Sequence, residues 1–115
     1  MRVGIVGGTG DIGEGMAMRL SRIMDVCVGS RDPSKAQDTC NTCLLSAKEC
    51  GVDCSVKAGT NQEVVEQSDL IILAIPFKHL KATIEGINGW EGKIVVSPVN
   101  PMERRDSFVY TPPQE

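Results

Sequence analysis

Five short apolar runs alternate with helix-like segments along the 115 residues of this chain. Most of these runs are almost continuously apolar, which is typical of strands buried on both faces of a parallel sheet. Parallel neighbours need crossover connections, and the segments between the runs have the period of amphipathic helices. The pattern therefore predicts an α/β fold with a doubly wound parallel sheet in a single domain. The expected strands span residues 2–6, 25–29, 52–57, 69–75 and 93–97.

Short-range signals mark where the helices between these strands begin and end. Asp32 before Pro33 is typical of a helix start and Gly51 of a helix end, so a helix is expected from residue 33 to about residue 49. Thr60 and Glu63 have the spacing of a capping box for a third helix. The expected apolar faces are Ile12, Met16, Leu20 and Ile23 in the first helix, and Leu80, Ile84 and Ile87 in the fourth.

Five glycines fall within residues 6–16, directly after the first expected strand. The segment from Gly8 to Gly13, GTGDIG, matches the pattern G-x-G-x-x-G between a strand and a helix, which is typical of Rossmann-type dinucleotide-binding domains. In such a turn the first glycine permits the tight bend, the second lets a pyrophosphate approach the backbone, and the third lets the helix pack on the strand. The N–H groups at the helix start then bind the phosphates, and Asp11 is expected to contribute its backbone amide while its carboxylate points away.

The residues after the second strand distinguish between the two nicotinamide dinucleotides. NAD-selective sites usually place an acidic residue there, which accepts hydrogen bonds from the ribose hydroxyls. In this chain Arg31 can pair with a 2′-phosphate, Ser30 can donate a hydrogen bond to it, and Lys35 follows one helical turn later. Asp32 is assigned instead to capping the helix that begins at Pro33. NADP is therefore the expected cofactor.

Composition excludes several classes of function. The net charge of −3 and the isoelectric point near 5.1 give no electrostatic reason to expect a nucleic acid or an anionic membrane as partner. No apolar run approaches the ~18 residues of a membrane span, and the N-terminus reaches glycine too soon for a secretory signal. A cytoplasmic location with reduced cysteines is therefore expected.

The cysteines at positions 40, 43, 50 and 54 include one C-x-x-C spacing, which also occurs in zinc and iron–sulfur sites. However, Cys40, Cys43, Ala47 and Cys50 recur at helical spacing. This spacing favours packing of the thiols as small apolar groups on the buried face of the second helix. No metal site is predicted.

Four segments resemble the N-terminal domain of the coenzyme F420-dependent NADP oxidoreductases: MRVGIVGGTGDIGEGMAMRL, VGSRDPSKA, AIPFKH and KIVVSPVNPM. The resemblance covers nearly the whole chain. It implies reversible hydride transfer between the reduced deazaflavin coenzyme F420 and NADP, so the partners would be small-molecule coenzymes, and a homodimer is left open. Because hydride passes directly between the two rings, no catalytic acid, base or nucleophile is expected.

The resemblance also implies which residues contact the dinucleotide. In the turn that contains Gly8, the pyrophosphate would be held by Thr9, Gly10, Asp11 and Ile12, and the 2′-phosphate by Ser30, Arg31 and Lys35. The nicotinamide half would be bordered by Ile75, Pro76, Phe77 and His79, with Pro98, Val99 and Asn100 nearby. Family members often carry Trp at the position of Phe77 and another apolar residue at that of Asn100. His79 would either orient a coenzyme group or cap the helix after Pro76.

Residues 1–100 are thus expected to form the NADP-binding domain, and residues 101–115, rich in proline, an irregular C-terminal segment. The family resemblance implies a further, mostly helical domain that these residues do not include, so binding of NADP with little hydride transfer is expected. A stand-alone NADP-binding module and the first domain of an imine or ketol-acid type reductase remain alternatives. A short-chain dehydrogenase is disfavoured because Gln114, not lysine, stands four residues after Tyr110.

Overall fold

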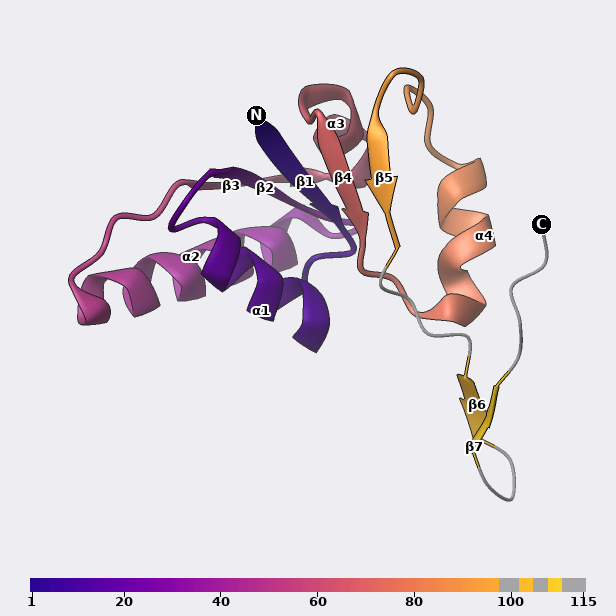
Figure 1. The fold of residues 1–115 in the computed structure, drawn as a ribbon, viewed down its shortest axis with the longest axis horizontal. Helices are drawn as coiled ribbons and strands as arrows, with labels where there is room; N and C mark the ends of the chain where they lie inside the picture. Colours follow the sequence, from indigo (N-terminus) through magenta and orange to yellow (C-terminus); the bar gives the residue numbers. More distant parts are fainter. Residues whose placement is uncertain (98–101, 105–107, 111–115) are drawn as a thin grey trace.

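The computed structural model describes residues 1–97, 102–104 and 108–110 and confirms the doubly wound α/β fold (Figure 1). Five parallel strands pair in the order β3-β2-β1-β4-β5. The strands are β1 (Arg2–Val6), β2 (Asp25–Ser30), β3 (Val56–Thr60), β4 (Leu70–Leu73) and β5 (Ile94–Val96). The helices are α1 (Asp11–Leu20), α2 (Pro33–Cys50), α3 (Asn61–Gln67) and α4 (Phe77–Glu85).

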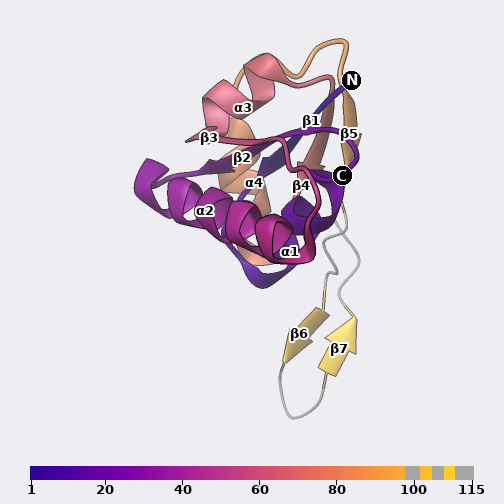
Figure 2. The ribbon, with the colours of Figure 1, turned by 90° about the vertical axis from the view of Figure 1, so that its left-hand side faces the viewer.

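The helices cover both faces of the sheet, α1 and α2 on one side and α3 and α4 on the other (Figures 1 and 2). Successive side chains of a strand point to opposite faces, so Ile5 of β1 joins the cluster under α1 and α2, while Val6 joins the cluster under α3 and α4. On the α3 side Gly4 has no side chain to separate the layers, and a Cβ there would lie 2.5 Å from Val64 Cγ1. This glycine therefore lets α3 pack directly on the centre of the sheet.

The third strand lies further along the chain than residues 52–57. It pairs with β2 from Val56, opposite Val26, to Thr60, opposite Ser30. Just before this pairing, Ser55 connects two elements: its N–H donates to the carbonyl of Ser21 at 2.8 Å, and its carbonyl accepts from the N–H of Val26 at 3.1 Å. The connection before β3 is thus anchored to the end of α1, and pairing along β2 starts later than the apolar pattern indicated.

The buried face of α1 also differs from the expected one. Gly13 and Ala17 are fully buried, and the small size of these residues lets the helix approach the sheet closely. Met16 and Leu20 pack against the core as expected, whereas Ile12 is 60% exposed and Ile23 is 75% exposed. Ile23 lies beyond the end of the helix, and Ile12 lies in its first turn, beside the glycine-rich loop.

The signals at the ends of α2 and α3 are confirmed. Asp32 accepts a hydrogen bond from the N–H of Ser34 at 3.0 Å, and Gly51 ends α2 with φ +70°, a conformation that favours glycine. Thr60 and Glu63 form the reciprocal capping box of α3. The predicted buried positions of α2 are confirmed for Cys40, Cys43 and Ala47, but Cys50 is exposed. In the α4 region Ile87 is buried, and Leu80 and Ile84 pack against the same cluster.

The sequence predicts an irregular segment after residue 100, but part of this segment forms regular structure. The strands β6 (Met102–Arg104) and β7 (Phe108–Tyr110) form an antiparallel pair, with Glu103 opposite Val109. Both views show this pair apart from the five-stranded sheet (Figures 1 and 2). Among the helices of the described residues, none is long and apolar enough to cross a membrane.

Candidate functional site

The carboxyl ends of β1, β2, β3 and β4 meet at one edge of the sheet, where a cavity of about 640 Å³ opens. Cavities of roughly 300–1,000 Å³ are typical of small-molecule sites. The cavity lies where the connections leave β1 and β4 in opposite directions, the position at which doubly wound sheets bind ligands. Its lining comes from four connections and α4: Gly7, Thr9, Gly10, Ser30, Arg31, Asp32, Lys35, Asn61, Ala74, Ile75, Pro76, His79 and Thr83.

The glycine-rich turn after β1 is crowded on its protein side and open toward the cavity. The sequence motif places the tight bend at Gly8. In the structure the bend lies one residue earlier, at Gly7, which has φ +71°. A Cβ at Gly8 would lie 2.7 Å from Val28 Cγ1, and a Cβ at Gly13 would lie 2.6 Å from Gly8 Cα. The last glycine therefore lets α1 pack closely, as expected, although its contact is with the turn after β1 and not with the strand itself. At Gly10, by contrast, a Cβ would meet nothing within 4 Å.

The N-terminus of α1 begins at this open glycine. Gly10 is the N-cap and has no side chain with which to cap the helix, so the amides of the first turn are left for a ligand. The helix dipole adds positive potential at the same place. The carboxylate of Asp11 lies in the first turn and is exposed. Turn and helix together form a suitable anion-binding site of backbone N–H groups.

The end of β2 brings Ser30, Arg31 and Lys35 to the same cavity. Ser30 is buried, and its hydroxyl oxygen accepts a hydrogen bond from the N–H of Asp32 at 3.2 Å, which leaves the hydroxyl hydrogen free to donate. Arg31 and Lys35 are exposed cations. Asp32 is occupied by its cap: the hydroxyl of Ser34 donates to it at 2.7 Å, and this bond, with that from the Ser34 N–H, lowers the pKa of Asp32.

The residues after β4 form an apolar side of the same cavity. Ile75 is buried beneath the glycine turn, where a Cβ at Gly7 would lie 2.9 Å from its Cγ1. Pro76 is exposed and precedes α4; the N–H of His79 donates to its carbonyl at 2.9 Å. His79 is also one of the residues that line the cavity. The side chain of Phe77, and the whole of Pro98, Val99 and Asn100, lie outside the described residues.

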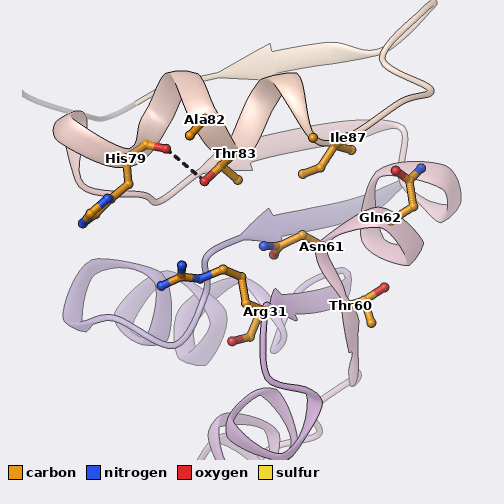
Figure 3. A pocket seen from close by; sticks show the side chains of 10 residues that line it. Arg31, Thr60, Asn61, Gln62, His79, Ala82, Thr83 and Ile87 are labelled. Carbon is orange, nitrogen blue, oxygen red and sulfur yellow. Dashed lines mark hydrogen bonds between the residues drawn. The ribbon is translucent and has the colours of Figure 1, made fainter.

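A second cavity of about 390 Å³ extends from the first into the space between α3 and α4 (Figure 3). The two cavities share five residues: Ser30, Arg31, Asn61, His79 and Thr83. On α4 the hydroxyl of Thr83 donates to the carbonyl of His79 at 3.0 Å. Sequence reasoning had not identified Thr60, Asn61, Gln62 or Thr83 as site residues. The capping box at the end of β3 was the available signal for the first three.

The cysteines lie away from these cavities. Burial raises the pKa of Cys40 and of Cys43 to about 11, so both remain neutral thiols at physiological pH. Burial also raises the pKa of Cys27. Within the ranges that the structure describes, no three His, Cys, Asp or Glu residues are arranged to hold a metal ion.

Comparison with known proteins identifies relatives by sequence. Residues 2–101 match the model of a family described as NADP oxidoreductase, coenzyme F420-dependent. The F420-dependent NADP reductase of Methanocaldococcus jannaschii is 33% identical over 98 residues, which are 84% of this chain and 44% of the relative. That of Methanothermobacter marburgensis is 33% identical over 105 residues, which are 90% of this chain and 46% of the relative. The chain thus spans less than half the length of these curated relatives.

Solved structures share the fold. A candidate F420-dependent NADP reductase from Arthrobacter sp. FB24 superposes with a TM-score of 0.66 at 23% identity, over 88% of this chain and 46% of that one. The lactate dehydrogenase of Cryptosporidium parvum, solved with lactic acid and nicotinamide adenine dinucleotide, gives a TM-score of 0.69 at 17% identity, over 88% and 38% of the two chains. At these identities the likeness establishes the architecture alone.

Proposed function

This chain belongs to the F420-dependent NADP oxidoreductase family, and on that premise we propose that it is the NADP-binding part of an enzyme that transfers hydride between reduced coenzyme F420 and NADP. In this proposal residues 1–100 form the dinucleotide-binding domain. The observation that carries it is one cavity with two anion sites: the open turn at Gly10 and the pair Arg31 and Lys35.

The residues present fit NADP. The turn that begins at Gly8 offers the backbone amides of residues 9–12 to the pyrophosphate, and Gly10 leaves room for close approach. Arg31, with Ser30 and Lys35 beside it, offers a planar fork, a hydroxyl hydrogen and a second cation to the 2′-phosphate. Asp32, the acidic residue that would favour NAD, is engaged in capping α2.

For the nicotinamide half, the proposal places Ile75, Pro76, Phe77 and His79 along its border, with Pro98, Val99 and Asn100 nearby. When bound, the nicotinamide ring supplies or accepts a hydride. The contribution of the chain is to orient the ring and to exclude water from one of its sides, for which the buried Ile75 is suited. A cytoplasmic location is part of the proposal and agrees with five free cysteines.

Calorimetric titration of the protein with NADP and with NAD, at one fixed ionic strength, tests the proposal. We expect NADP to bind at least about tenfold more tightly than NAD, because one charge-assisted hydrogen bond contributes roughly 1.5–3 kcal/mol. Coenzyme F420 is then titrated into the NADP-saturated protein to test for the second coenzyme. Equal affinity for NAD and NADP, or no binding of either, would contradict the proposal.

A further inference from the structure

Asn61 lies between the two cavities, at the first position of α3. Its backbone is fixed by the capping box around it. The hydroxyl oxygen of Thr60 accepts from the N–H of Glu63 at 3.2 Å, and the carboxylate of Glu63 accepts from the N–H of Thr60 at 3.2 Å. The half-buried side chain of Asn61 therefore starts from a rigid support.

This side chain reaches across the end of β2 to the glycine turn. The N–H of Gly7, 54 positions away in sequence, donates to Asn61 Oδ1 at 3.2 Å. The path exists because residue 29 is glycine: a Cβ there would lie 2.7 Å from the same oxygen. Gly29 also accepts, through its carbonyl, the N–H of Gly8 at 2.9 Å. Two neighbouring amides of the turn are thus held from outside it, one by a backbone carbonyl and one by the Asn61 side chain.

The contact with Gly7 determines which way the amide of Asn61 faces. A backbone N–H can only donate, so the carboxamide oxygen must face Gly7 and the nitrogen Nδ2, with its two hydrogens, must face away. Figure 3 shows this nitrogen directed into the space between Arg31 and α4. The bond to Gly7 does not use these two donors, and they lie where a ligand would pass from the turn toward Arg31.

We propose that Asn61 is a positioning and binding residue for the dinucleotide. Its Oδ1 holds the turn in the shape that presents the amides after Gly8, and its Nδ2 donates to an oxygen of the adenosine diphosphate portion that NAD and NADP share. This inference rests on the proposed function for the identity of the ligand. It differs from the role of Arg31, which acts on the 2′-phosphate alone.

The two halves of the proposal are separated by two variants. Asn61→Asp keeps an acceptor for Gly7 but replaces the Nδ2 donor with an anionic oxygen, so the thermal midpoint should stay near that of the wild type. Binding of both NADP and NAD should weaken by about tenfold or more, the loss expected for one hydrogen bond to a charged group. Asn61→Ala removes both functions, so the amide proton resonance of Gly7 should move upfield, and Asn61→Asp should restore it.

A matched control is Asn41→Asp, which makes the same chemical change at an exposed position of α2 outside both cavities. It should leave both affinities and the Gly7 resonance unchanged. Wild-type affinity in Asn61→Asp would overturn the donor role, and an unmoved Gly7 resonance in Asn61→Ala would overturn the positioning role. If the wild type itself binds neither dinucleotide, the proposed function and the donor role fall together. The Gly7 resonance would still decide the positioning role.

Discussion

At the scale of single residues, the proposed selectivity for NADP rests on the different roles of Arg31 and Asp32. One carboxylate oxygen of Asp32, Oδ1, accepts two hydrogen bonds from Ser34, and these bonds tie Asp32 to the start of α2. The adjacent guanidinium of Arg31 lines both cavities and is exposed. A cation near a helix N-terminus is repelled by the positive end of the helix dipole. A phosphate that binds beside the cation offsets this repulsion.

We therefore predict that Arg31→Ala weakens NADP binding by about 10- to 100-fold, the range for a lost charge-assisted hydrogen bond. NAD binding should remain nearly unchanged, because NAD lacks the 2′-phosphate. Arg19→Ala removes an exposed arginine of α1 that lines neither cavity and serves as the control. Calorimetric titration of the three proteins with both dinucleotides provides the measurement. An equal loss for NAD and NADP would show that Arg31 is not the discriminating residue.

Local residue signals could be predicted from the sequence, and contacts between distant segments could not. The caps at Asp32 and Thr60 depend on atoms within three residues, so the sequence pattern contains their whole cause. For Asn61 the capping box indicates its place at the end of β3 but not its contact with Gly7, which forms only when β1 and β3 join one sheet. The placement of the positive φ at Gly7 likewise depends on the bonds and packing that hold the turn.

At the scale of elements, α1 shows why an apolar period alone misplaces a buried face. The pattern suggested a face with Ile12, whereas Gly13 and Ala17 are the fully buried positions. Small residues let a helix approach the sheet so closely that its larger neighbours lie at the sides of the contact. The position of β3 was missed for a related reason, since the connection before it is anchored to Ser21 by a tertiary hydrogen bond.

Two glycines of α1 provide a matched test of this close packing. Gly13→Ala should destabilise the protein by about 1–3 kcal/mol, because the new Cβ would lie 2.6 Å from Gly8 Cα. This clash is with the backbone, so a change of side-chain rotamer cannot relieve it. Gly15→Ala should instead stabilise it by about 0.5–1 kcal/mol, because a Cβ there meets nothing within 4 Å and alanine favours a helix interior. Urea unfolding of both variants measures the difference. Similar effects of the two substitutions would contradict the packing of α1 on the turn.

At the scale of the whole molecule, the sequence predicted the layered architecture because the central strands β1, β2 and β4 and the helices packed on them carry patterns of buried residues. At the edge of the sheet β5 departs from the expected burial, since Ile94, Val95 and Val96 are all exposed. The sheet separates two apolar clusters, one under α1 and α2 and the other under α3 and α4. Thiols belong to both clusters, with Cys40 and Cys43 in the first and Cys27 in the second. Global stability is therefore linked to the protonation of buried thiols.

The linkage predicts how stability changes in alkaline solution. Burial, reinforced for Cys40 by neighbouring cysteines, raises the pKa of both Cys40 and Cys43 from 9.0 to about 11 in the folded protein. Between these values the unfolded chain releases the two protons while the folded chain keeps them, so the free energy of unfolding must fall as pH rises from about 9 to about 11. Below pH 9 both states hold the protons, and this contribution is fully present.

The double variant Cys40→Ala/Cys43→Ala should show a shallower decline, though not a flat one, because Cys27 also has a raised pKa. Cys50→Ala, which removes an exposed thiol, should keep the wild-type slope. Urea unfolding under reducing conditions at several pH values between 8 and 11 gives the three slopes, and identical slopes for the double variant and the wild type would show that these thiols do not control the alkaline loss of stability.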